Sequence, residues 1–181
     1  MVIISKGQIV EIPATSPLYG RVQPEFGSEK EALCWYARRA YSLFDGFLVG
    51  EHSGTDNFIL GQRKGTNVGG KKAPLYVIGI DRAENRLFVG EGENHPGLWN
   101  TVLAFAQNSV HWHEDFEPLK ANQENGIGVQ VSSSVMHHST AAKLYIFGAE
   151  VFLQFEEPVA VAVQDHPLVI SYKNNVIAEK K

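Results

Sequence analysis

The stretch Gly61-Gln62-Arg63-Lys64-Gly65-Thr66-Asn67-Val68-Gly69-Gly70 decides the fold of the first half of the chain. Its four glycines allow the backbone to take positive φ and to lie close to another surface. Arg63 and Lys64 stand near its start, and Lys71 and Lys72 follow it directly. The sequence therefore predicts a basic loop with little side-chain bulk.

Short strands are predicted on both sides of this loop, because Val, Ile, Leu and Phe alternate with turn residues there. The predicted strands cover Gly46–Gly54, Asn57–Leu60, Leu75–Ile80 and Arg86–Gly90. A turn at Asp81–Asn85 joins the last two, so the loop is expected between two hairpins. Residues 3–12 predict a further hairpin or pair of strands about Lys6-Gly7-Gln8.

One helix is predicted at about residues 28–44. Ser28 and Glu31 have the spacing of a capping box, in which each side chain satisfies a backbone N–H of the first turn. Apolar residues then recur at helical spacing up to Asp45-Gly46, at Leu33, Tyr36, Ala37, Ala40, Tyr41 and Phe44. We expect Cys34 and Trp35 to be core residues, although Arg38, one turn on, leaves open a reactive thiolate at Cys34.

The chain becomes all-β beyond Gly97. Segments rich in Val, Ile, Phe and Tyr alternate with turns, which predicts a small β-barrel or sandwich; they lie around 101–112, 127–135, 143–147, 150–155, 159–163, 167–172 and 175–178. A cluster of glycine and proline near Glu91–Gly97 predicts the domain boundary. The predicted fold is mainly β (α+β), with a small central β domain at 1–94 that contains the helix and a small barrel at 95–181.

Composition is that of a globular protein, with 181 residues, 44% hydrophobic and 20% charged. No apolar run approaches the roughly 20 residues that span a bilayer, and the start lacks the pattern of a signal peptide. We therefore expect a cytoplasmic protein without membrane contact. Cys34 is the only cysteine, so an internal disulfide or a multi-thiolate metal site is excluded.

Charge is uneven along the chain, although the net charge is only −4. Residues 1–90 hold 11 Lys and Arg against 9 Asp and Glu, whereas residues 91–181 hold 5 against 11. Phosphate contacts dominate the affinity of proteins for nucleic acids, so an RNA surface is expected in the first half, at Arg63, Lys64, Lys71 and Lys72. The alternative is that these cations only solvate a surface loop.

Histidines offer a rival chemistry. His111 and His113 would share one face of a strand, and with His137, His138 and either Glu114 or Asp115 they could form a zinc site. The sequence has no metal-binding spacing of the HExxH kind, so no metal ligands are assigned. His95, before Pro96, could either hold a turn or contact RNA, and it is kept as a candidate RNA contact.

A longer pattern then resembles a known family, the tRNA-specific 2-thiouridylases. The resemblance covers residues 50–96 in order and spacing, in Gly50-Glu51-His52, Gly54, Gly61-Gln62-Arg63-Lys64-Gly65, Gly69-Gly70, Pro74-Leu75-Tyr76-Val77, Asp81, Asn85-Arg86-Leu87, Val89-Gly90 and His95-Pro96. It continues more weakly in Leu98, His111-Trp112 and Phe155–Ala160. It implies the central and carboxy-terminal part of such an enzyme, with a β-barrel at the end.

The chain departs from this family where the chemistry is performed. The family's ATP-using loop of the Ser-Gly-Gly-x-Asp-Ser kind (the PP-loop) does not occur in this sequence, nor does a second cysteine for sulfur transfer. P-loop, Rossmann and G-x-S-x-G patterns are also missing. No catalytic residue and no cofactor are therefore predicted, and we do not expect this chain to catalyse thiolation by itself. The strand at 128–138 lacks the Lys and Arg that the family's barrel usually carries there.

The sequence thus predicts a noncatalytic module that binds tRNA or another structured RNA and is accessory to tRNA modification, possibly beside a separate PP-loop catalytic chain. The predicted RNA contacts are Gln62, Arg63, Lys64, Lys71, Lys72 and His95. Two alternatives stay open: a protein–protein scaffold with an acidic barrel surface, and a histidine-based metalloenzyme.

Overall fold

The structure is a computed structural model that describes residues 6–37, 40–114, 116 and 125–181. Contacts between residues divide the chain into two compact units. The first unit comprises residues 1–24 and 39–99, and the second comprises residues 25–38 and 100–181. Each unit has a sheet and a hydrophobic core of its own, and each is described by itself.

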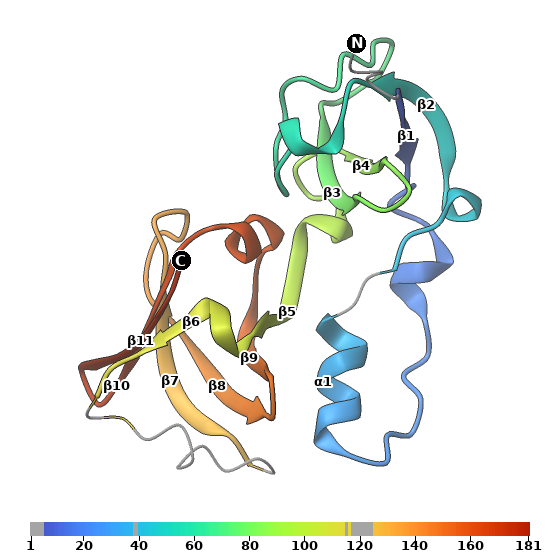
Figure 1. The fold of residues 1–181 in the computed structure, drawn as a ribbon. Helices are drawn as coiled ribbons and strands as arrows, with labels where there is room; N and C mark the ends of the chain where they lie inside the picture. The colour runs from blue at the N-terminus through green and yellow to red at the C-terminus, as the bar shows by residue number, and fades with distance from the viewer. Residues whose placement is uncertain (1–5, 38–39, 115, 117–124) are drawn as a thin grey trace. The chain divides into compact units, whose positions relative to one another are not determined.

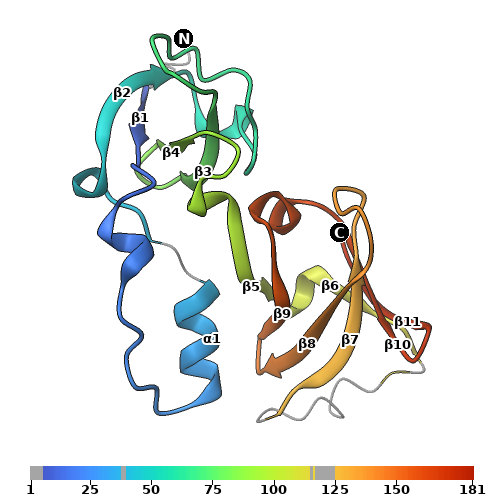
Figure 2. The same ribbon diagram turned by 180° about the vertical axis from the view of Figure 1, so that it is seen from behind.

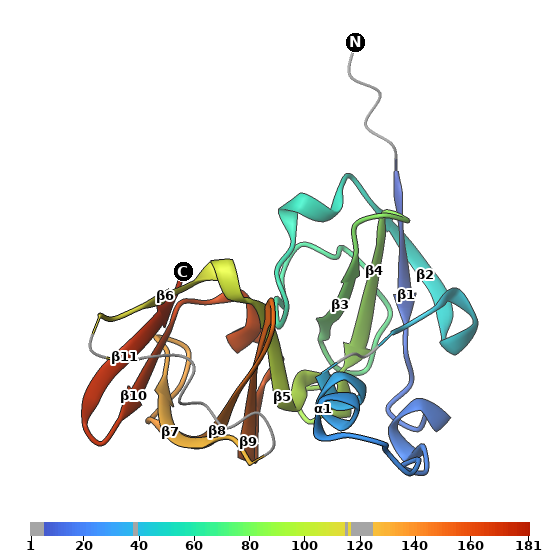
Figure 3. The same ribbon diagram turned by 60° about the horizontal axis from the view of Figure 1, so that its bottom comes forward.

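The first unit is built on a four-stranded mixed sheet. Its strands are β1 (Gly7–Glu11), β2 (Phe47–His52), β3 (Leu75–Asp81) and β4 (Arg86–Glu91), in the order β2-β1-β4-β3 (Figure 3). β1 is antiparallel to β2 and parallel to β4, and β3 is antiparallel to β4. One face carries a buried cluster of Ile9, Phe58, Leu75, Val77, Leu87 and Val89.

The predicted hairpin about Asp81–Asn85 is confirmed. β3 and β4 pair from Asp81 and Arg86 onwards, and Asn85 takes the positive φ of 52° that the turn requires. The predicted strand at Asn57–Leu60 is wrong. β2 pairs with β1 instead, and a 3-10 helix, η3 (Thr55–Asn57), follows it. Phe58 is buried in the core cluster, so packing rather than strand pairing fixes this segment.

The carboxy-terminal part of the predicted strand pair forms β1, while residues 3–5 lie outside the described residues. The predicted turn about Lys6-Gly7-Gln8 is wrong, because Gly7 and Gln8 belong to β1 and pair with His52 and Glu51 of β2. Two further 3-10 helices of the first unit begin at residues with accepting side chains. η1 (Pro17–Gly20) follows Ser16, and η4 (Pro96–Leu98) follows His95. Both carry proline at their first position, where the missing N–H has no helical partner to lose.

The second unit is a seven-stranded half-barrel (Figures 1 and 2). Its strands follow the order β5-β9-β8-β7-β10-β11-β6. They are β5 (Trp99–Ala106), β6 (Val110–Trp112), β7 (Ile127–Ser132), β8 (Thr140–Phe147), β9 (Glu150–Ala160), β10 (Leu168–Tyr172) and β11 (Asn175–Lys180). Two 3-10 helices, η5 (Gln107–Ser109) and η7 (Val161–Asp165), join successive strands. The predicted mainly β fold is confirmed, with the barrel as a half-barrel.

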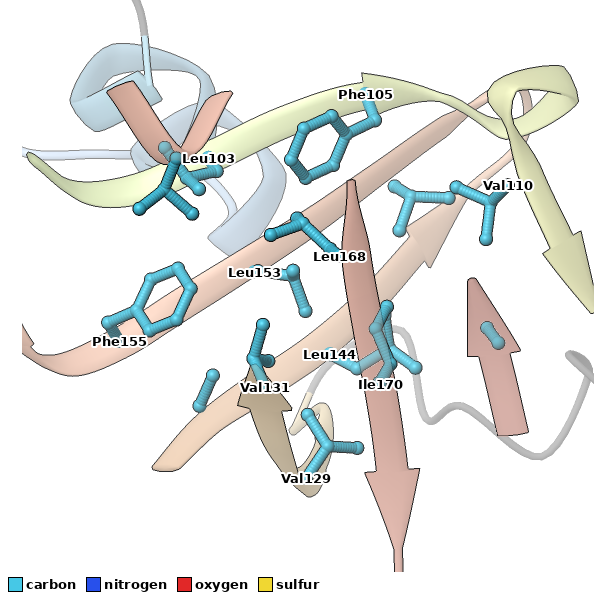
Figure 4. Packing of buried hydrophobic residues seen from close by; sticks show 14 of the residues in the cluster. Leu103, Phe105, Val110, Val129, Val131, Leu144, Leu153, Phe155, Leu168 and Ile170 are labelled. Atoms are coloured by element: carbon cyan, nitrogen blue, oxygen red, sulfur yellow. The ribbon is translucent and has the colours of Figure 1, made fainter. Parts of the chain in front are cut away.

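The concave face of this sheet holds the main core. Alternate residues of each strand point inward, as the two-residue period of a strand requires. Figure 4 shows Leu103 and Phe105 of β5, Leu144 of β8, and Leu153 and Phe155 of β9 gathered with residues of β7 and β10. The remaining members include Val110, Val129, Val131, Leu168 and Ile170.

The outer face of the same sheet is covered by the helix α1 (Glu29–Ala37). Fully buried Leu33 packs with Val102 of β5, Tyr145 of β8 and Phe152 of β9. Lys30 also forms an ion pair with Glu150 at 2.9 Å. Contacts therefore group the helix with the second unit, whereas the sequence grouped it with the first domain. The boundary at residue 95 stays a prediction.

The start of the helix agrees with the capping box, with one difference. Ser28 Oγ accepts from the backbone N–H of Glu31 at 3.2 Å, but the Glu31 carboxylate accepts from Gly27, one residue further back, at 2.9 Å. The predicted helix extent is wrong. Residues 38 and 39 lie outside the described residues, and a separate 3-10 helix, η2 (Leu43–Asp45), covers the end of the predicted range.

A second capping box explains why the helix does not continue to residue 44. Ser42 Oγ accepts from the backbone N–H of Phe44 at 3.3 Å, and Asp45 Oδ2 accepts from the backbone N–H of Ser42 at 2.7 Å. These local bonds occupy the groups that a continuous helix would use, which favours a new start at Ser42.

Candidate nucleic-acid interface

The central loop, residues 61–72, is attached to the sheet of the first unit at its start. Gly61 N–H donates to the Val77 carbonyl at 2.7 Å, and Val77 N–H donates to the Gln62 carbonyl at 2.9 Å. The chain then turns through positive φ at Gly61, Gly65, Asn67 and Gly70. Glycine and asparagine tolerate this region best, so the sequence favours the observed path.

Gln62 braces the loop from within. Its Oε1 accepts from the backbone N–H of Ile59 at 3.1 Å, and its Nε2 donates to the Lys64 carbonyl at 2.8 Å. Both ends of the amide are therefore bonded to backbone groups at or just before the start of the loop. The structure places this predicted RNA contact as a residue that shapes the backbone beside Arg63 and Lys64.

Two small side chains pin the tip of the loop. Thr66 is buried, and Val68 packs against the core cluster of the first unit. A Cβ built on Gly50 of β2 would lie 3.0 Å from Val68 Cγ2, so Gly50 makes room for this contact. The loop thus has a fixed backbone although most of its charged side chains are exposed.

The four predicted cations divide into two kinds. Arg63, Lys64 and Lys72 are exposed, and within residues 6–37, 40–114, 116 and 125–181 none of their side chains has an ion pair or hydrogen bond. Lys71 instead pairs with Glu11 at the end of β1. The Lys71 side chain is 27% exposed and that of Glu11 is 13% exposed. Nothing in the local sequence pattern links these two distant positions.

His95 lies inside the first unit. It is 2% exposed, and its Nδ1 accepts from the backbone N–H of Gly97 at 3.1 Å. Nε2 must then carry the ring proton, which it donates to the Ile12 carbonyl at 2.9 Å. Tyr19 contacts the ring edge-on, with 5.5 Å between centroids. This geometry holds the turn that begins η4 and agrees with the turn-holding alternative.

The other histidines do not converge on one point. His111 and His113 lie with ring centroids 5.8 Å apart, and His113 Nε2 is 3.8 Å from Glu179 Oε1. His137 and His138 are exposed in the bend after β7. Asp115 lies outside the described residues. In the part of the chain that the structure describes, no three His, Cys, Asp or Glu side chains come together as a metal site.

Cys34 is half-buried and packs against the cluster formed by the helix and the outer face of the half-barrel. Arg38, the cation on which a reactive thiolate at Cys34 would depend, lies outside the described residues. Trp112 packs against the barrel core and stacks on Phe116 with 6.0 Å between centroids. None of the helices among residues 6–37, 40–114, 116 and 125–181 has the length and apolarity needed to cross a membrane.

Comparison with known families matches residues 37–91 to the family described as "tRNA methyl transferase PRC-barrel domain". The matched range contains β2, β3 and β4 and the whole central loop. The basic loop therefore lies within the range that matches this domain.

Curated relatives extend this match over nearly the whole chain. The tRNA-specific 2-thiouridylase MnmA of Christiangramia forsetii is 32% identical over 175 residues, which cover 93% of this chain and 42% of the relative. The proteins of that name from Karelsulcia muelleri and Flavobacterium johnsoniae are 32% and 31% identical and are likewise covered to 42%. The chain thus spans less than half the length of these relatives. The predicted resemblance is confirmed: the chain belongs to the tRNA-specific 2-thiouridylase family and corresponds to the middle and carboxy-terminal region of its members.

Proposed function

We propose that this chain binds tRNA, or another structured RNA, by contacts between its central loop and the phosphates of the RNA. We further propose that it is accessory to tRNA modification. The observation that carries the proposal is the exposure of Arg63, Lys64 and Lys72 on a loop whose backbone is pinned by the Gly61–Val77 hydrogen bond and by Val68. Cations without protein partners are free to pair with phosphates, and their backbone needs little further ordering.

Recognition through this loop would rest on phosphates and on the shape of the RNA. Lys and Arg side chains that contact phosphates position a nucleic acid without reading its bases, and folded RNA is recognised largely by shape. In this proposal Gln62 and His95 keep the surface in shape, while Lys71 contributes only part of its charge because Glu11 faces it.

The chemical step would belong to a PP-loop catalytic part, acting together with this chain in the cytoplasm. The relatives are named as tRNA-specific 2-thiouridylases, and this chain corresponds to 42% of their length. The chain carries one cysteine. We therefore propose a division of labour in which the present region holds the RNA and the PP-loop part activates and thiolates the base.

The test is binding of the purified chain to total tRNA over a range of salt concentrations. The variant Arg63→Ala/Lys64→Ala is compared with Lys6→Ala/Arg82→Ala, which removes the same charge from exposed positions of the same unit outside the loop. We expect micromolar or tighter binding that weakens with salt. The loop variant should lower the slope of log K against log salt by about two, because each lost phosphate contact removes about one.

Two results would contradict the proposal. One is the absence of binding at low salt. The other is an equal loss of affinity in both double variants, which would show that the loss depends on net charge and not on the position of the loop cations.

A second candidate function is protein docking, and it is favoured by exposed apolar side chains in the first unit. Phe44 of η2 is 98% exposed, and Phe47 and Leu48 of β2 are also exposed. β2 stands at one end of the sheet order, where a strand offers unpaired backbone groups to a partner. The partner that we propose for this surface is the PP-loop catalytic part.

Docking predicts a different response to substitution. Phe44→Ser/Phe47→Ser should abolish association with a purified PP-loop domain of this family, while Arg63→Ala/Lys64→Ala should leave it intact. Val22→Ser, at another highly exposed apolar position, is the matched control. Association that survives Phe44→Ser/Phe47→Ser would contradict this candidate.

A further inference from the structure

A pocket of about 540 Å³ lies beside the central loop in the first unit. Arg63 contributes one part of its wall, Tyr76 of β3 another, and the turn after β4 the rest through Glu91, Glu93 and Asn94. Arg63 is thus shared between the exposed cations of the loop and the lining of this pocket.

The walls of the pocket are held by hydrogen bonds between segments that are distant in sequence. Ala73 N–H donates to Glu91 Oε1 at 2.7 Å, and Gly92 N–H donates to the Pro74 carbonyl at 2.9 Å. His95 N–H donates to the Gly92 carbonyl at 3.3 Å, and the buried His95 ring anchors the end of this turn on Ile12. A ligand would therefore meet a preformed site, which lowers the entropic cost of binding.

The lining chemistry excludes some ligands and favours others. Glu91 and Glu93 both border the pocket, whereas Arg63 is its only cation among the lining residues that the structure describes. Two carboxylates repel a phosphate group inside the pocket. They accept hydrogen bonds from ring N–H and amino groups. Tyr76 adds an aromatic side chain and Asn94 an exposed amide, which together suit a planar, donor-rich molecule.

We propose that this pocket takes a single nucleobase splayed out of the RNA, and that it prefers guanine to uracil. The inference rests on the proposed function, because the phosphates flanking that base would be bound by Arg63 and the adjoining cations. Unstacked bases in RNA loops are commonly held by aromatic or Arg planes and by hydrogen bonds to their edges.

Guanine is preferred because of the pattern of donors on its edge. Its N1–H and its amino group stand side by side and match the two oxygens of one carboxylate, for which we assign Glu93. Uracil presents one N–H between two carbonyl oxygens, and both carbonyls would be repelled by a carboxylate. Glu91 already accepts from Ala73 with Oε1, which makes Glu93 the freer of the two acids.

The experiment measures binding of two short single-stranded RNAs at one salt concentration: an eight-nucleotide oligouridine, and the same oligomer with one central guanosine. The readout is the ratio of their dissociation constants, in which any uniform electrostatic change cancels. We expect a ratio of about ten in the unmodified chain, as for one good bidentate base contact. Glu93→Gln should bring the ratio close to one, while Glu84→Gln, which removes an equal charge in the same unit away from the pocket, should leave it unchanged.

The outcomes separate this inference from the proposed function. Equal binding of both oligomers by the unmodified chain would overturn the guanine pocket and leave phosphate binding standing. A ratio of ten that persists in Glu93→Gln would also overturn the assignment. Failure to bind either oligomer or tRNA at low salt would overturn both proposals together.

A titration with guanosine 5′-monophosphate and uridine 5′-monophosphate, followed by amide chemical shifts, tests the pocket directly. Shifts at Tyr76 and at residues 91–95 with the guanine nucleotide, and not with the uracil nucleotide, support the site. Shifts confined to residues 63–72, or equal for both nucleotides, overturn it.

Discussion

His95 and Ile12 are joined by a 2.9 Å hydrogen bond from the ring Nε2 to the backbone carbonyl. The bond joins Ile12, the residue directly after β1, to the turn after β4. Gly90 makes this position possible, because a Cβ built there would lie 2.4 Å from His95 Nδ1. The glycine near the end of β4 is therefore explained by the ring packed against it.

Gly90→Ala should destabilise the first unit, because either the His95 ring or β4 must move. We expect a loss of about 2 to 3 kcal/mol in the free energy of unfolding, as for other overpacked core sites. Gly69→Ala is the matched control, since a Cβ there would meet nothing within 4 Å. Urea unfolding measures both variants. Equal stability of the two would show that the close contact carries no cost.

The ion pair between Lys71 and Glu11 predicts a gain of RNA affinity when it is broken. Glu11→Gln keeps the size of the side chain, removes a negative charge beside the loop and frees Lys71. We expect tRNA to bind about two- to fivefold more tightly, and the salt slope to steepen by about one. Glu84→Gln, which faces Arg86 instead, removes the same charge elsewhere in the unit. Identical effects of the two substitutions would contradict a specific role for Lys71.

The loss of tRNA affinity on removing one loop cation should depend on whether that cation already forms an ion pair within the protein. Lys72 is exposed and unpaired within the described residues, whereas Lys71 faces Glu11. We expect Lys72→Gln to lower tRNA affinity more than Lys71→Gln, by roughly threefold, because the charge of Lys71 is already partly neutralised. Parallel salt titrations of the two variants compare them. A larger loss in Lys71→Gln would show that Lys71 leaves Glu11 to reach the RNA.

Tyr145 predicts a loss of stability at high pH. Burial raises the pKa of its phenol from the usual 10.0 to about 12, and the charge of Glu29 and a hydrogen bond to it act in the same direction. A folded-state pKa above the unfolded value means that the folded chain holds the proton more tightly. The contribution is therefore fully present below about pH 10 and is lost as the pH rises to about 12.

Urea unfolding of the second unit between pH 9 and pH 12 measures this loss, which we expect to reach about 2 to 3 kcal/mol. Tyr145→Phe removes the titrating group, together with the 3.1 Å hydrogen bond to Gln154, and it should flatten the pH dependence relative to the unmodified chain. Parallel curves for the two proteins would contradict the raised pKa of Tyr145.

Leu33 predicts that the helix stabilises the half-barrel. Its side chain is fully buried against Val102, Tyr145 and Phe152, so Leu33→Ala should cost about 2 to 5 kcal/mol. Amide hydrogen exchange should show the loss of protection in β5, β8 and β9. Lys30→Ala, at a partly exposed position of the same helix, should cost less than about 1 kcal/mol. Unchanged protection in these strands would contradict the prediction that the helix stabilises the half-barrel.

Local sequence was sufficient wherever short-range chemistry decided the structure. The β3–β4 hairpin followed from two apolar runs about a polar turn, and Ser28 with Glu31 gave the start of the helix. The glycine-rich loop predicted positive φ angles, which are found at three of its four glycines, Gly61, Gly65 and Gly70. The strand prediction for Asn57–Leu60 was wrong because Phe58, a residue type typical of strands, packs in the core without pairing in the sheet.

The sequence did not indicate that the helix packs on the half-barrel, because the packing partner of a helix depends on which sheet face it covers. A signal was available in β8 and β9, where Leu144, Tyr145 and Ile146 and then Val151, Phe152 and Leu153 are apolar on both faces of the strand. Such runs are typical of strands covered on both sides. They indicate that another element must pack on the outside of the half-barrel, although they do not identify that element as α1.

The sequence by itself determined the mainly β fold, the family and the basic character of the central loop, because these depend on residue types and spacing along the chain. Only the tertiary structure decided which members of the loop present their charge. Glu11 faces Lys71, the Gln62 amide turns inward and the His95 ring is buried on Ile12. Gln62 bonds its near neighbours Ile59 and Lys64, whereas the Lys71–Glu11 and His95–Ile12 pairings join residues that are far apart in sequence. These two pairings arise from strand register and packing, which no local pattern encodes.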